Sequence, residues 1–178
     1  MRPMETTLRI EVFSGEDLER EVERLAGLLH ESVRQGASIG FILPHEPDDS
    51  RDYWQQQVRP ALLAGQRILL VAKQGKNVVG SGQLNIAMPD NQAHRAEISK
   101  VIVHPAQRRL GIGRALMEAL ETAARQLGRG LLTLDTASEG AKRLYRQQGF
   151  EVAGSIPDYA RAALEDRLEA TTFMYKRL

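Results

Sequence analysis

The stretch Gln107–Leu116, which reads QRRLGIGRAL, decides the fold that this chain is expected to adopt. It follows an apolar, strand-like segment over 98–103 and opens an amphipathic helix over 111–127. A glycine-rich turn at a helix start aims backbone N–H groups outward, and the helix dipole adds positive charge at the same point. The stretch also carries three arginines, Arg108, Arg109 and Arg114. It therefore predicts a binding site for a pyrophosphate group.

Three phosphate-binding patterns compete for this glycine-rich turn. A dinucleotide fingerprint needs a third glycine where this chain has Leu116, and an acidic residue about 20 residues further on, where this chain has a loop around Arg129-Gly130. A P-loop ends in Gly-Lys-Ser/Thr, whereas this turn ends in Gly113-Arg114-Ala115. The third pattern, Arg/Gln-x-x-Gly-x-Gly/Ala after a strand, is matched in full by Arg108-x-x-Gly111-x-Gly113. An ordinary strand-to-helix turn with solvated arginines is the remaining alternative.

Composition restricts the class of protein. The 178 residues suit a single domain over 1–178, and 42% hydrophobic and 26% charged residues are ordinary globular values. A net charge of +1 gives no general field for nucleic acid or an anionic membrane, so neither is expected as a partner. The absence of cysteine excludes a thiolate nucleophile and a Cys-ligated zinc, and the four histidines lack metal-ligand spacing, so no metal is expected. No segment has the apolar length of a transmembrane helix or a signal peptide, so we expect a cytoplasmic protein.

Apolar periodicity predicts an α/β domain. Strands are expected over 8–13, 67–73, 78–87, 96–103, 131–136, 150–156 and 171–176. Helices are expected over 18–33, from 48 to a stop near Pro60, over 111–127 and over 140–148. The central strand–helix–strand unit implies parallel pairing, and the outer strands join through hairpins. The expected architecture is therefore a mixed central sheet of about seven strands with flanking helices.

A second segment, from Ala141 to Phe150, reads AKRLYRQQGF and resembles the A-x-x-L-Y-x-x-x-G-F segment of the GNAT N-acetyltransferases. The loop pattern at 108–113 is the one that this family carries, and the order of the elements resembles its acyl-CoA N-acyltransferase fold. The chain is most similar to the tabtoxin-resistance type of acetyltransferase, in residues 36–41, 95–100, 129–136, Pro157-x-Tyr159 and the last strand. The resemblance implies acetyl-CoA as the acetyl donor and leaves the acceptor open.

The implied reaction requires a base. An alkylamine is largely an ammonium ion at neutral pH and must lose a proton before it attacks a thioester. Glu97 is the first candidate, because some family members carry a base glutamate at the same offset before the loop; a surface salt bridge with Arg95 or Lys100 is the alternative. Asp135, near the end of an apolar strand, would bind the ammonium or pass its proton to water, or else cap the next helix. The base is thus Glu97, Asp135 or an ordered water.

The resemblance also assigns contacts to the donor. Tyr145 occupies the position at which the family's phenol protonates the departing thiolate; packing against Phe150 is the alternative. The strand before the loop would pair with the pantetheine arm and offer an N–H to the thioester oxygen. These strand residues are Val101, Ile102 and Val103. The pyrophosphate would be bound by the amides of Arg108, Arg109, Leu110, Gly111, Ile112, Gly113 and Arg114.

The resemblance further implies that the acceptor pocket is built from the first two helices, the loop before strand 96–103 and the last strands. Its candidate residues are Ser38, Phe41, Tyr53, Trp54, His94, Arg95 and Tyr159. Any one of the aromatic residues would serve equally as core or rim, and His94 ranks behind Glu97 as a base.

Three functions are compatible with these residues. The first is acetylation of a primary amine of a small molecule. The second is acetylation of a protein N-terminus or lysine, which calls for an open groove. The third is a coenzyme A-binding module without catalysis, against which Glu97, Asp135 and Tyr145 argue. The sequence leaves open whether the chain forms a homodimer.

Overall fold

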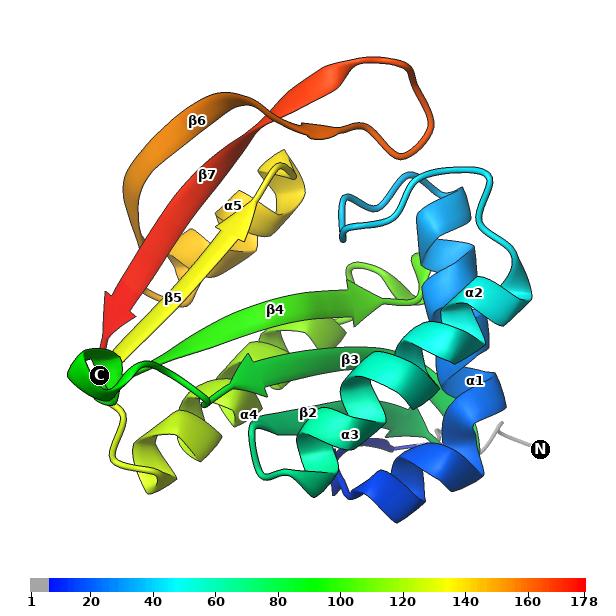
Figure 1. Cartoon of the computed structure of the whole chain (residues 1–178), viewed down its shortest axis with the longest axis horizontal. Coiled ribbons are helices and arrows are strands. Elements are labelled where there is room, and N and C mark those ends of the chain that lie inside the picture. The colour runs from blue at the N-terminus through cyan, green and yellow to red at the C-terminus, as the bar shows by residue number, and fades with distance from the viewer. Residues whose placement is uncertain (1–6) are drawn as a thin grey trace.

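Seven strands form one mixed sheet in the computed structural model, which describes residues 7–178 (Figure 1). Their order across the sheet is β1-β2-β3-β4-β5-β7-β6. The strands are β1 (Leu8–Phe13), β2 (Arg67–Gln74), β3 (Asn77–Asn85), β4 (Arg95–Val103), β5 (Leu131–Thr136), β6 (Glu151–Arg161) and β7 (Leu168–Arg177). The α/β architecture predicted from periodicity is confirmed, with β4 and β5 parallel as the central unit requires.

The two central strands share only a short contact. β4 and β5 pair through Arg95, Ala96 and Glu97 against residues 131–133. Beyond Glu97 the strands diverge, as the green and yellow arrows of Figure 1 show. The side of β4 that faces β5 therefore has no strand partner from Ile98 onward within the described chain. This opening is the feature that positions the functional site.

Helices cover both faces of the sheet (Figure 1). The longest, α1 (Gly15–Arg34), begins at a capping box between Ser14 and Asp17, and its apolar stripe packs on one face. That face also carries α2 (Pro47–Asp52), a π-helical turn η1 (Tyr53–Val58) and α3 (Arg59–Leu63). The opposite face packs against α4 (Ile112–Gln126) and α5 (Glu139–Gln147). We call these the α1 face and the α4 face.

The structure corrects two details of the predicted elements. The helix expected to stop near Pro60 continues to Leu63, because Pro60 lies in the first turn of α3, where a missing N–H breaks no helical hydrogen bond. The last hairpin is longer than expected, since pairing continues to Arg161 opposite Leu168. Two short 3-10 turns, η2 (Asp90–Gln92) and η3 (Pro105–Gln107), flank β4.

Candidate active site

The glycine-rich turn forms the start of α4. Gly111 is the N-cap residue, with φ of 79°, and Arg109 before it has φ of 64°. No side chain caps this helix, so its first backbone N–H groups have no acceptor from a cap. An uncapped helix start with its dipole directed outward is suited to an anion. The geometry agrees with the phosphate-binding prediction for this turn.

The two glycines of the turn are required for different reasons. A Cβ at Gly113 would lie 3.0 Å from Leu144 Cδ2 and 3.7 Å from Val103 Cγ2, so the glycine lets α4 approach α5 and the end of β4 closely. A Cβ at Gly111 would meet no atom within 4 Å. Gly111 is instead required by its left-handed backbone, which residues with a Cβ adopt at a cost of about 1–2 kcal/mol.

The charge around this turn is only partly compensated. Arg114 pairs with Glu118 at 2.8 Å along α4. Arg108 and Arg109 are exposed, and neither forms an ion pair within residues 7–178. These two guanidinium groups remain free to meet a phosphate group.

A bulge changes the direction of β4 beside the opening. Lys100 has φ of 51°, and the pairing register with β3 shifts between Ser81 and Gln83. Before the bulge, Ile98 packs on the α4 face; after it, Ile102 packs on the α1 face. The bulge therefore turns Lys100 toward the α1 face, on the same side as Glu97.

Glu97 is the last residue of β4 that pairs with β5. Its side chain is 42% exposed, and a carboxylate oxygen lies 3.7 Å from Arg95. Arg95 makes shorter contacts elsewhere, to Gln92 at 2.6 Å and to Thr133 at 3.2 Å. The salt-bridge alternative for Glu97 is thus present as a long contact, and it leaves the carboxylate accessible to accept a proton.

Asp135 lies on β5 beyond the last residue that pairs with β4, and Tyr145 lies on α5 with its ring in the core of the α4 face. Asp135 follows Thr133 on the side of β5 opposite the buried Leu132 and Leu134, and it accepts a hydrogen bond from the Thr171 hydroxyl at 2.9 Å. The cap of α5 is supplied by Ser138 rather than by Asp135, so the capping alternative for Asp135 is wrong. Burial, and then the negative charge of Asp135, raise the pKa of Tyr145 to about 12.

The Tyr145 phenol is therefore protonated throughout the neutral range. The ring is 7% exposed and packs against Phe150 with centroids 6.1 Å apart. Among residues 7–178, the hydroxyl makes no hydrogen bond. The packing alternative and a role for the hydroxyl are both compatible with this placement.

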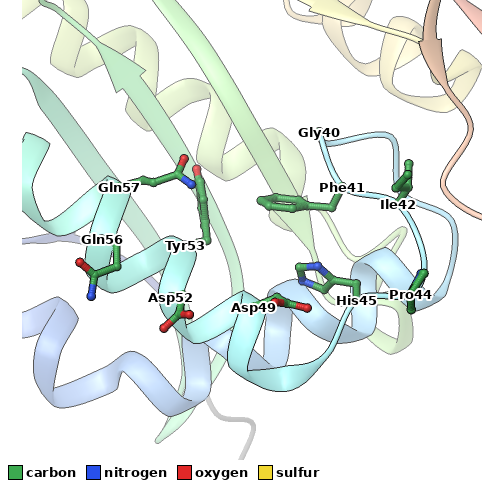
Figure 2. A pocket seen from close by; sticks show the side chains of 10 residues that line it. All are labelled: Gly40, Phe41, Ile42, Pro44, His45, Asp49, Asp52, Tyr53, Gln56 and Gln57. Atoms are coloured by element: carbon green, nitrogen blue, oxygen red, sulfur yellow. The ribbon is translucent and has the colours of Figure 1, made fainter.

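A cavity of about 430 Å³ lies between the loop at 40–45 and the helical segment at 49–57. In Figure 2 the rings of Phe41 and Tyr53 lie next to one another on the side of the cavity nearest the strands. They meet edge to face, with centroids 5.1 Å apart. The Lys100 ammonium lies 5.7 Å from the Phe41 centroid and 5.9 Å from that of Tyr53.

Two loops meet across the open end of the sheet. The backbone N–H of Leu43 donates to the carbonyl of Ala163 at 3.1 Å, which joins the loop after α1 to the loop between β6 and β7. A Cβ at Gly36 would lie 3.0 Å from Leu164, a further sign of close approach between the two loops. The divergence of β4 and β5 is thereby bridged on the α1 face.

A buried polar network fixes the position of the Tyr53 hydroxyl. The fully buried Gln83 donates to the Tyr53 hydroxyl at 3.0 Å and accepts from Arg67 at 2.9 Å. Sequence reasoning missed Arg67, Gln83 and Lys100, because polar residues on strands usually face solvent. Only the strand register and the bulge show that these three side chains point to the same part of the α1 face.

The predicted acceptor residues fall into three groups. Phe41 and Tyr53 line the cavity, and Arg95 lies beside Glu97. Ser38 and Tyr159 are exposed, Tyr159 packing on Phe173, which pairs with Asp135. The other two predictions are corrected, for Trp54 and His94.

Trp54 has no exposed surface and packs in the core of the α1 face, so its assignment to the acceptor pocket is wrong. His94 accepts from Gly130, before β5 begins. Asp135 lies five residues further along the strand, or about 16 Å at the rise of a β-strand. His94 therefore lies at the end where β4 and β5 are paired, too far from Asp135 to act as the base of the site.

Over residues 7–178, none of the helices has both the length and the apolar character to cross a bilayer. Nor does that part of the chain gather three or more histidine, aspartate or glutamate side chains at a place that could hold a metal ion.

Comparison with known proteins identifies the family. Residues 30–150 match the model of the acetyltransferase (GNAT) family. The chain is 38% identical over 92 residues to the IAA acetyltransferase of Azospirillum brasilense, a match that covers 51% of this chain and 58% of that protein. It is 30% identical over 132 residues to an uncharacterised N-acetyltransferase encoded between hisH and hisA in the same organism, covering 73% of this chain and 74% of the relative.

The fold is shared with a solved acetyltransferase. A phosphinothricin acetyltransferase from Sinorhizobium meliloti, solved in complex with acetyl-CoA, superposes with a TM-score of 0.76 at 21% identity, over 97% of this chain and 89% of that one. The sequence matches lead to one conclusion, with which the uncapped glycine turn and the diverging strands agree: the chain belongs to the acetyltransferase (GNAT) family.

Proposed function

We propose that this chain transfers the acetyl group of acetyl-CoA directly to a primary amine of a small molecule. One observation carries the proposal. The strands β4 and β5 part after Glu97, whose carboxylate is accessible, and the unpaired edge of β4 leads toward the uncapped start of α4. The protonated phenol of Tyr145 on α5 is the acid in this proposal. An anion site, a strand edge, a base and an acid are the groups that thioester aminolysis needs.

The donor fits this opening by its chemistry. Its pyrophosphate would be bound by the free N–H groups at the start of α4, with Arg108 and Arg109 alongside. Its pantetheine arm carries amides, which would hydrogen-bond the edge of β4 over 101–103 as an added strand does. The close contact of Gly113 with α5 keeps these two parts of the site adjacent.

The proposed chemistry assigns one proton to each group. Glu97, directly or through a water, takes a proton from the acceptor ammonium, and the freed amine attacks the thioester carbon. A backbone N–H of β4 stabilises the oxyanion as the C–N bond forms. The C–S bond then breaks as Tyr145 donates its proton to the thiolate, and the second proton that the amine nitrogen loses in forming the amide returns through water to the tyrosinate. The carboxylate of Asp135 on β5, whose charge also acts on Tyr145, attracts the ammonium group before that group loses its proton.

The contact between the two loops favours a small acceptor. The Leu43–Ala163 bond joins the loops across the open end, and an open cavity of about 430 Å³ beside Phe41 and Tyr53 has room for a small molecule. A protein N-terminus or lysine would call for an open groove. The likeness to a phosphinothricin acetyltransferase supports the small-molecule reading, and the tabtoxin-resistance type stays a prediction.

The test is product analysis. Purified protein is incubated with acetyl-CoA and a panel of amino acids, polyamines, simple alkylamines and short peptides, and acetylated products are identified by mass spectrometry. Acetylation of small amines, with free coenzyme A formed in equal amount, is the expected result. Modification of peptides alone would overturn the small-molecule acceptor, and tight binding of acetyl-CoA without any product would leave only a binding module.

A further inference from the structure

Two basic side chains on the acceptor side of the sheet have no acidic partner. Arg67 donates only to the amide of Gln83, and its Nε is buried without a hydrogen-bond partner. Lys100 lies over two aromatic rings and forms no ion pair within residues 7–178. Another cation of β2 differs in this respect, since Lys73 pairs with Glu21 at 3.0 Å.

Strand register places both cations beside the proposed base. Arg67 pairs with Asn85, and Asn85 pairs with Glu97, so the three residues form a row across three strands. Their side chains all point to the α1 face, opposite the neighbours that pack on α4. Adjacent strands are about 4.8 Å apart, so Arg67 and Glu97 are separated by about 10 Å at the backbone. Lys100 enters the same space through the bulge.

The two cations bring positive charge to this part of the α1 face. Burial, and then the charge of Arg67, lower the pKa of Lys100, while Asp135 acts in the opposite direction. Partly buried cations without counter-ions raise the energy of a folded protein unless a ligand supplies the anion. The guanidinium plane of Arg67 still has its Nε–H free, and an arginine fork matches a carboxylate in two parallel hydrogen bonds.

We propose that the acceptor is an amino acid, whose carboxylate is bound by Arg67 and Lys100 while its amine lies toward Glu97. The inference rests on the proposed acetyl transfer and specifies the substrate class of that same site. Phe41 and Tyr53 would pack against the side-chain carbons of the amino acid. The hydrogen-bond chain from Arg67 through Gln83 to Tyr53 would hold the guanidinium and the aromatic wall in fixed relation.

The experiment compares matched pairs of acceptors. Each amino acid is paired with the amine that lacks its carboxylate, and kcat/KM is measured for both with wild-type protein. α-Amines and side-chain amines form separate arms, because either would satisfy the same carboxylate site. Since hydrogen bonds to charged groups contribute strongly, we expect the carboxylate to raise kcat/KM by about 100-fold.

Variants then connect this preference to the two cations. In Arg67→Gln and Lys100→Met, the ratio of kcat/KM between the paired acceptors should fall by about tenfold or more, while the Kd for acetyl-CoA stays that of wild type. Arg67→Lys should keep part of the preference, because the charge remains and the fork is lost. Lys76→Met, on an exposed turn between β2 and β3, is the matched control for loss of a lysine charge.

Each outcome decides a different point. Equal kcat/KM for the paired acceptors in wild-type protein would overturn the carboxylate site while leaving acetyl transfer intact. A preference that survives in both variants would overturn the role of Arg67 and Lys100. The intact mass of the protein after incubation with acetyl-CoA is a separate readout, and an acetyl group on Lys100 would also overturn the proposal. No product from any amine would instead refute the function on which it rests.

Discussion

Introducing a carboxylate at Gly111 should weaken donor binding while changing the stability of the protein little. Gly111→Asp places a side chain at the N-cap of α4, where nothing lies within 4 Å of the new Cβ. The left-handed backbone costs about 1 kcal/mol, with aspartate among the residues that tolerate it best. An acidic group at a helix N-terminus returns about 0.3–1 kcal/mol. The free energy of unfolding should therefore change by less than about 1 kcal/mol.

Donor binding should weaken much more. The new carboxylate would accept hydrogen bonds from the same N–H groups that bind the pyrophosphate, and its charge would repel the pyrophosphate. Two unit charges about 5 Å apart interact by about 3 kcal/mol at an effective dielectric constant of 20. Salt reduces that repulsion at an exposed site. A net loss of about 2–3 kcal/mol corresponds to a rise in the Kd for coenzyme A of about 30- to 150-fold.

Calorimetric titration with coenzyme A and thermal unfolding measure the two quantities. The matched control is Gly128→Asp, at the opposite end of the same helix, where the glycine has φ of 69° and again nothing lies within 4 Å of the new Cβ. There the acidic group opposes the dipole, so stability should fall while the Kd stays unchanged. A Gly111→Asp protein that binds coenzyme A within threefold of wild type would refute the phosphate site at this turn.

Three further predictions concern single side chains. Tyr145→Phe should lower kcat by about 10- to 100-fold without weakening donor binding. Because the phenol pKa is raised to about 12, the wild-type rate should not fall between pH 8 and 10, and a fall there would argue against Tyr145 as the acid. Glu97→Gln should lower kcat/KM by about 100-fold or more at neutral pH, with a smaller deficit at high pH where the amine is already neutral; an unchanged rate across pH would exclude Glu97 as the base. Trp54→Ala should destabilise the fold by about 3–5 kcal/mol in urea unfolding, and a raised acceptor KM at wild-type stability would restore Trp54 to the pocket.

The donor side of the site was predictable from sequence because its determinants are local. Gly111, Gly113 and Tyr145 act through a helix start and a helix position, which short motifs specify. Trp54 and Tyr53 are adjacent on one helical segment, and periodicity alone does not say which of them faces the core. The π-helical turn at 53–58 shifts the residues that share a face, which a regular helical period does not anticipate.

The acceptor side depends on contacts between distant segments. His94 is close to Glu97 along the chain, yet it lies at the closed end of the opening. Arg67 and Lys100 come together only through the pairing of three strands and one bulge. The direction of Lys100 is set by a single residue with positive φ, and lysine gives no local signal for that conformation.

The bulge at Lys100 also has a consequence for how such enzymes diversify. The proposed acceptor wall is encoded mainly before residue 85, by Phe41, Tyr53, Arg67 and Gln83, whereas the proposed donor contacts are encoded after residue 100. The two groups of residues meet at β4, whose bulge would let one strand present side chains to the acceptor and a backbone edge to the donor. On this proposal, substitutions in the first half of the chain would change the acceptor while the binding of acetyl-CoA is retained.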